Sequence, residues 1–156
     1  MKKKLLIDLI GLLLIALIVV VGYKLSPLLL PQADLVAHPD PGCDLQRQAC
    51  AVELPGGGRA ELLAAPLPIP MVKPFTVRVR VSGLRVSAVE VDFAGIDMNM
   101  GLNRPQLVAE GDGRFVGEAT LPVCISGQMD WQATVLLTTE RGRMALPYRF
   151  TTGGGG

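Results

Sequence analysis

The sequence predicts an all-β domain, built as an antiparallel sandwich of two packed sheets and preceded by a single membrane-spanning helix. Two observations lead to this fold class. Residues 5–23 hold 16 apolar residues out of 19, whereas residues 51–152 contain repeated runs in which apolar and polar residues alternate. Alternation with a period of two is typical of strands that bury one face, and no convincing amphipathic helix follows residue 30. A chain of 156 residues has the size of one domain.

Residues 1–24 are predicted to form a basic tip and a membrane anchor. Nineteen helical residues rise about 28 Å, close to the thickness of the hydrocarbon core of a bilayer. Three lysines, Lys2, Lys3 and Lys4, precede the apolar run, so the positive-inside rule places the remainder outside the cytoplasm. We expect a single-pass protein of the bacterial inner membrane with a periplasmic domain. A cleaved secretory signal is the alternative, but residues 21–27 contain no Ala-x-Ala pattern.

The next segment, residues 25–42, is predicted to be an extended stalk because its prolines disfavour a helix. These prolines are Pro27, Pro31, Pro39 and Pro41. The sandwich domain is predicted to cover residues 43–152. Residues 153–156 are four glycines with no side chain to bury, and we expect a loose tail there.

The clearest predicted strand covers residues 76–82. Its inward side chains are Val77, Val79 and Val81, and its outward ones are Arg78 and Arg80. Further strands are predicted at residues 51–54, 59–65, 88–93, 107–109, 114–121, 130–139 and 144–152. Phe115 and Trp131 are expected in the core. Parallel neighbours need connections of a dozen or more residues, and these links are short, so the pattern favours an antiparallel sandwich of immunoglobulin-like architecture.

Three cysteines are present, and an exported domain lies where disulfides persist. Cys43 and Cys50 have six residues between them, across a polar, turn-like stretch. This spacing predicts a local disulfide and leaves Cys124 over. Pairing of Cys43 or Cys50 with Cys124 is the competing arrangement, and the sequence leaves it open.

Several function classes are disfavoured by composition. The only histidine, His38, lies in the predicted stalk, whereas hydrolytic and catalytic zinc sites usually need an imidazole on a rigid scaffold. Four basic residues and one acidic residue lie in residues 1–24, so 11 basic and 13 acidic residues remain and offer no basic face to nucleic acid. A thiol-redox role is weaker, because Cys43 and Cys50 do not form a Cys-x-x-Cys motif. We therefore expect a non-enzymatic protein without a nucleic-acid partner.

Met98 and Met100 are the candidate site residues. In extended backbone, side chains two residues apart project to the same side, and glycines flank this pair in the sequence. Thioethers are soft ligands that select Cu(I). Cys124, or Met129 shortly after it, would add a third sulfur if the two loops face each other. The alternative is that both methionines only fill gaps in the core beneath a loop.

Four short motifs carry a family resemblance. They are a Met-x-Met-Gly turn at residues 98–101, a Gly-x-aromatic-x-Gly strand at residues 113–117, the Leu121-Pro122 pair, and a strand that begins at Trp131. With the single anchor, residues 72–150 resemble the FixH-like and YtkA-like families of bacterial envelope proteins. The resemblance implies an immunoglobulin-like extracytoplasmic domain associated with copper supply or with assembly of haem–copper terminal oxidases. It implies Met98 and Met100 as copper ligands and no catalytic residue. The three cysteines depart from the simpler family pattern.

The resulting hypothesis is a non-enzymatic envelope protein anchored in the inner membrane. It binds Cu(I) through Met98, Met100 and Cys124, or assists assembly of a respiratory oxidase, with that oxidase or a copper-delivery protein as partner. The rival hypothesis is a structural interaction module that docks on a membrane complex and binds no metal.

Overall fold

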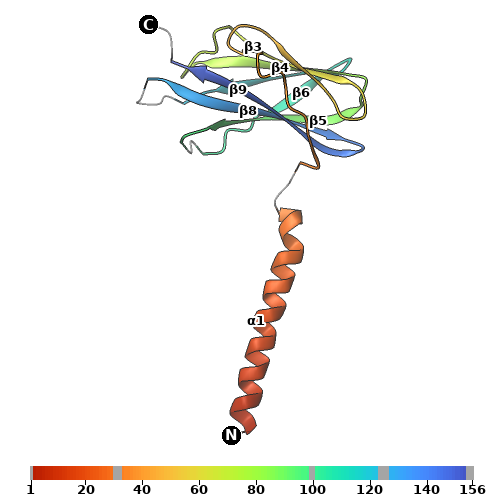
Figure 1. Cartoon of the computed structure of the whole chain (residues 1–156), viewed down its shortest axis with the longest axis vertical. Coiled ribbons are helices and arrows are strands. Elements are labelled where there is room, and N and C mark those ends of the chain that lie inside the picture. Colours follow the sequence, from red (N-terminus) through yellow and green to blue (C-terminus); the bar gives the residue numbers. More distant parts are fainter. Residues whose placement is uncertain (1, 30–32, 99–100, 123–126, 154–156) are drawn as a thin grey trace. The chain divides into compact units, whose positions relative to one another are not determined.

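The structure is a computed structural model that describes residues 2–29, 33–98, 101–122 and 127–153. It divides into two compact units, Met1–Gln32 and Ala33–Gly156. The first unit contains helix α1, Lys2–Leu29 (Figure 1). Within α1, the 19 residues Leu6–Lys24 have a mean hydropathy of 2.8, which makes the helix long and apolar enough to cross a membrane. The predicted apolar amino-terminal helix is confirmed.

The second unit is built from strands. They are β1 (Leu35–Val36), β2 (Cys50–Glu53), β3 (Arg59–Ala65), β4 (Pro74–Ser82), β5 (Val86–Gly95), β6 (Gln106–Gly111), β7 (Arg114–Thr120), β8 (Met129–Thr139) and β9 (Gly142–Thr152). The predicted all-β fold class is confirmed. Every strand expected from alternation is present, and β3 has the predicted bounds.

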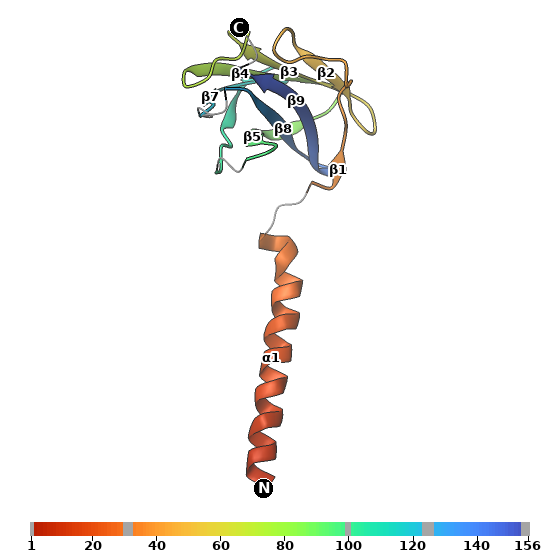
Figure 2. The same cartoon turned by 60° about the vertical axis from the view of Figure 1, so that its left-hand side comes forward.

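The nine strands form one curled sheet in the order β1-β9-β8-β5-β6-β7-β4-β3-β2. Figure 2 shows β3 and β4 lying across from β5, β8 and β9, as in a sandwich. The two layers are joined because β6 pairs with β5 through Gln106 and Leu107 and with β7 through Val108 and Ala109. A register shift within the β6–β7 pairing follows Ala109. The sequence predicted two separate sheets, and this strand makes them continuous.

Strand β1 is a second difference from the prediction. It lies within residues 25–42, the predicted stalk, and pairs in parallel with β9, with Leu35 beside Met144 and Val36 beside Ala145. The backbone N–H of Ala37 also donates to Ala145 O at 3.0 Å. A strand of two residues has no alternation to detect, so its pairing was not predictable from the pattern.

The core follows the predicted strand phase. In β4, Val77, Val79 and Val81 are buried while Arg78 and Arg80 are exposed. Phe115 is buried as predicted, and Trp131 is fully buried on β8. The indole Nε1 of Trp131 donates to Thr152 Oγ1 at 2.9 Å. Phe75 and Phe93 meet edge to face with ring centroids 5.6 Å apart, which links the two layers.

The domain has two ends, defined by its loops. The chain enters at Asp34, whose Oδ2 accepts from Arg143 N at 2.9 Å. This entry end also holds the tight turns of residues 54–58, 83–85, 111–113 and 140–141, and Arg141 Nη1 donates to Gly56 O at 3.3 Å there. Gly113 has a φ of 71°, and any Cβ at this position would overlap Val81 O. The opposite end, termed the loop end, comprises the described parts of four connections, at residues 43–49, 66–73, 96–98 with 101–105, and 121–122 with 127–128.

Candidate functional site

Met98 lies at the loop end, three residues after β5. Its side chain is 48% exposed, so it is not a gap-filling core residue. The other two predicted metal ligands, Met100 and Cys124, lie outside the described residues. The sequence also suggested Met129 as a third sulfur ligand. Its side chain is buried in β8 and belongs to the core.

The flanks of the two loops that carry these residues are joined by hydrogen bonds. Before Met98, Ile96 N donates to Asp130 O at 2.9 Å. After it, Asn103 Nδ2 donates to Thr120 O at 2.9 Å. Thr120 and Asp130 bracket the connection that contains Cys124. The structure therefore holds the described ends of both connections side by side.

The second half of the β5–β6 connection folds back onto β5. Phe93 N donates to Asn103 O at 2.9 Å, and Val91 N donates to Pro105 O at 3.1 Å. Arg104 Nη2 forms an ion pair with Asp92 Oδ2 at 3.1 Å, with both side chains mostly buried. These contacts fix the base of the loop, so Met98 projects from a supported segment.

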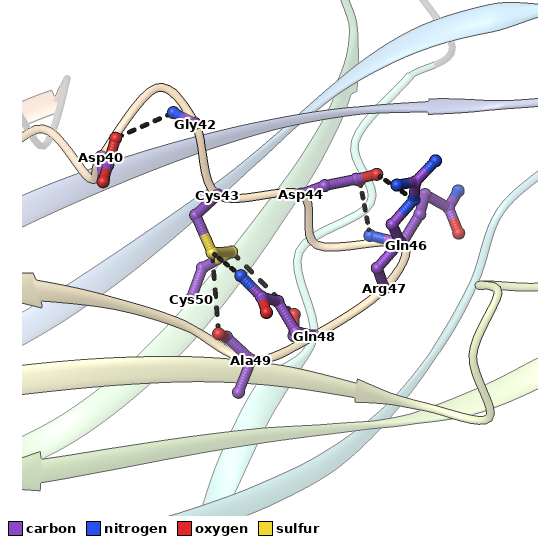
Figure 3. Close-up of a disulfide and its surroundings, with 9 residues drawn as sticks. All are labelled: Asp40, Gly42, Cys43, Asp44, Gln46, Arg47, Gln48, Ala49 and Cys50. Carbon is purple, nitrogen blue, oxygen red and sulfur yellow. Dashed lines mark hydrogen bonds and ion pairs between the residues drawn. A yellow bond between two sulfur atoms is a disulfide. The ribbon is translucent and has the colours of Figure 1, made fainter.

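The disulfide joins Cys43 to Cys50, as predicted (Figure 3). The competing pairing of either residue with Cys124 is therefore wrong. Asp44 organises the enclosed turn, because its Oδ1 accepts from Gln46 N at 3.0 Å and its Oδ2 lies 3.3 Å from Arg47 Nε. Figure 3 also shows the carboxamide of Gln48 directed at the disulfide, with Nε2 3.6 Å from Cys43 Sγ.

Gln46 fastens this disulfide loop to the sandwich. Its Oε1 accepts from Ile69 N at 2.7 Å, and its Nε2 donates to Thr151 O at 2.8 Å. One side chain thus connects the disulfide loop, the β3–β4 connection and the end of β9. The role of Gln46 was not predictable from the sequence, because a glutamine in a polar turn carries no signal of contacts 23 and 105 residues away.

Two clefts open beside the disulfide loop. The larger has a volume of about 830 Å³, with the apolar side chains of Ile69, Met71 and Ile96 and the polar side chains of Asp130 and Arg149 among its lining residues. The smaller, about 320 Å³, lies between residues 38–43 and the 147–149 part of β9. Pro41, Cys43 and Arg149 line both clefts. His38, the only histidine, is exposed on the wall of the smaller cleft.

Tyr148 is a buried side chain whose acidity is strongly perturbed. Burial, and to a lesser extent the Glu61 carboxylate, raises the pKa of the Tyr148 phenol well above its ordinary value of 10.0. Its hydroxyl is buried and has no hydrogen-bond partner among the described residues. The described residues include no group of three or more histidine, cysteine, aspartate or glutamate side chains placed to hold a metal ion.

Fold and site together define an all-β domain that follows an apolar helix and gathers a disulfide loop, an exposed thioether and two clefts at one end. Neither the scan against protein-family models nor the search of curated proteins finds a match. Among solved structures, the chain is similar to the crystal structure of an engineered protein, with 20% sequence identity and a TM-score of 0.45. That similarity covers 62% of this chain and 20% of the other. The resemblance to the FixH-like and YtkA-like families stays a hypothesis.

Proposed function

We propose that the protein is a non-enzymatic, membrane-anchored domain that binds Cu(I) at its loop end through Met98, Met100 and Cys124. The observation that supports the proposal most is the pair of hydrogen bonds that brackets the site, from Ile96 N to Asp130 O and from Asn103 Nδ2 to Thr120 O. These two bonds bring together the flanks of the β5–β6 connection, which carries Met98, and of the β7–β8 connection, which contains Cys124 in the sequence. An exposed Met98 thioether is also accessible to a metal ion.

The donor chemistry fits a monovalent soft ion. Thioethers bind Cu(I) well and bind Zn(II) poorly, because zinc prefers thiolate and imidazole donors. In an oxidising compartment, thioethers also remain available where thiols are consumed by disulfide formation. The ion-paired base of the loop, at Arg104 and Asp92, holds the backbone that presents Met98. The chain's residues would thus capture and hold the ion, and no catalytic step is assigned to them.

The apolar amino-terminal helix supports a periplasmic location for the domain in this proposal. An apolar span preceded by three lysines orients the domain toward the periplasm. A Cu(I)-binding domain tethered there would serve a membrane complex that needs copper, such as a haem–copper respiratory oxidase, or would exchange the ion with a copper-delivery protein.

A Cu(I) competition titration tests the proposal on the full chain in detergent under reducing conditions. Wild type should bind one equivalent, and Met98→Leu with Met100→Leu should lose binding. The matched control is Met144→Leu, because Met144 is buried in β9. Each Met-to-Leu exchange keeps apolar volume and should cost less than about 1.5 kcal/mol of stability. If Cys124 is a ligand, affinity should fall as the pH is lowered from about 8 to about 5, because its thiol must lose a proton on binding.

A docking module without metal is the second candidate, and one observation favours it. Ile96 and Leu102, on the same connection as Met98, are 45% and 83% exposed. Such apolar side chains at the surface are typical of an interface. Absence of Cu(I) binding in wild type, or equal binding by wild type and the double variant, would remove the copper proposal and leave this one.

A further inference from the structure

The edge of β9 is only partly covered. Strand β1 pairs with β9 at Met144 and Ala145 and then ends. Along this edge, Arg143 O accepts from Asp34 N at 2.8 Å and Ala145 O accepts from Ala37 N at 3.0 Å. After Ala37 the chain leaves β9. The remainder of β9, up to Thr152, has β8 on one side and no strand formed by the described residues on the other.

The backbone groups on this open edge can be identified by alternation. Residues 143 and 145 direct their main-chain groups at β1, so residues 147, 149 and 151 direct theirs to the same side. Thr151 O confirms this phase, because it accepts from the Gln46 side chain rather than from β8. Pro147 has no N–H to offer. The C=O of Pro147, the N–H and C=O of Arg149, and the N–H of Thr151 have no partner among the described residues.

Open space lies along these four groups. The smaller cleft is lined by Pro147 and Arg149, and the larger by Arg149 and Thr151. Both clefts separate β9 from the segment that leads to the disulfide, and they meet at Arg149. The open edge is therefore a groove with β9 as one wall and residues 38–46 as the other.

We propose that an extended segment of a partner protein binds in this groove as an added strand, next to β9 and in line with β1. An antiparallel segment whose central residue lies opposite Arg149 would use both Arg149 groups. The residue two positions before the central one would reach Thr151 N–H, and the residue two positions after it would reach Pro147 C=O. This gives four main-chain hydrogen bonds over five residues, a span of about 17 Å.

The groove also specifies the side chains of the partner. Arg149 is exposed and forms no ion pair with any described residue, so an acidic residue opposite it is favoured. The neighbouring positions face the side on which Tyr148 and Phe150 are buried, and apolar residues suit them. A second copy of this chain is disfavoured as the occupant, because a two-fold pairing of β9 centred on Arg149 would place the two Arg149 residues opposite each other.

The test uses the full chain in detergent and a displayed library of heptapeptides with a fixed central glutamate and random flanks. The best binder is then resynthesised. Arg149→Pro removes the edge N–H without removing a bond to β8, and Arg149→Ala removes only the guanidinium. We expect Arg149→Pro to weaken binding at least about tenfold and Arg149→Ala to weaken it about two- to fivefold. Amide hydrogen exchange at Arg149 and Thr151 should slow when the peptide is bound.

A version of the peptide N-methylated at the central glutamate is the matched ligand control. It retains the side chain and loses the donor to Arg149 C=O, so its binding should be weaker. Trp131 emission verifies that each variant is folded. The proposal is overturned by a library without binders, by equal effects of the proline and alanine variants, or by unchanged exchange at Arg149 and Thr151. A dimer that forms through β9 would overturn it in favour of self-association.

Discussion

Trp131 shows how one side chain combines burial with a specific polar contact. Its indole is fully buried, and its Nε1 has Thr152 Oγ1 as acceptor at 2.9 Å. Thr152 is itself 2% exposed, so water cannot replace that acceptor. The position of the indole in the core was predictable from strand phase. Its acceptor was not, because β9 alternation places Thr152 in the core without indicating which group it meets.

Thr152→Val should destabilise the domain by about 1–3 kcal/mol. Valine keeps the shape of threonine but leaves the buried indole N–H without an acceptor. The matched control is Thr151→Val, because the Thr151 hydroxyl bonds Asp130 at an exposed site and should cost less than about 1 kcal/mol. Denaturant unfolding followed by circular dichroism measures both free energies. Equal losses would mean that the indole bond contributes nothing.

The raised pKa of the Tyr148 phenol predicts that the domain loses stability at high pH. Its pKa is raised in the folded state, so the folded domain retains the phenolic proton at pH values where the unfolded chain has released it. The stabilisation is complete below the unfolded value of 10.0 and declines as the pH rises above it. Thermal unfolding at about pH 7 and about pH 11 should show this decline in wild type.

Tyr148→Phe is the matched variant for that measurement. It should reduce the alkaline loss, because phenylalanine has no proton to release. It should also raise stability at about pH 7 by up to about 1–3 kcal/mol, since the buried hydroxyl has no partner among the described residues. An alkaline loss of the same size in both proteins would assign it to other groups.

At the scale of elements, the disulfide loop is a small unit held by its covalent bond, by the Gln46 side chain and by Leu45, which is buried in the core. The double substitution Cys43→Ser with Cys50→Ser should lower stability by about 2–3 kcal/mol, the loop-closure entropy expected for so short a loop. Gln48→Ala is the control, because Gln48 is exposed and contacts the disulfide only at its edge. A loss below about 1 kcal/mol in the double variant would show that the contacts of Gln46 and Leu45 hold the loop without the covalent bond.

Long strands were predictable and short ones were not. Strands β4 and β8 carry enough alternation to fix both their existence and their inward faces. The short spacing of Cys43 and Cys50 favoured their pairing, but only the structure decided against a pairing with Cys124. The parallel pairing of β1 and the double pairing of β6 depend on contacts between distant segments. The groove along β9 could not be predicted either, because its position depends on where the pairing of β1 with β9 ends.

At the scale of the whole molecule, charge is divided between the two units. Residues 1–24 carry four lysines and one aspartate, whereas the remainder carries 11 basic and 13 acidic residues. We predict that a reporter fused after Phe150 is active only when exported, and that the mature chain begins at Met1. Amino-terminal sequencing and reporter activity check this. A processed terminus within residues 22–34 would show that the helix is a cleaved signal.

The parallel pairing of β1 with β9 has a mechanical consequence. A force applied at Asp34 along the axis of β1 would act across the hydrogen bonds that Arg143 O and Ala145 O accept. Those bonds lie perpendicular to the pull, so they resist together in shear and are not peeled one after another. If β9 were held near its carboxyl end, that force would run through the β1–β9 pair and bypass the disulfide loop and the connection that carries Met98. The domain can then be pulled from both sides while its loop end keeps its shape.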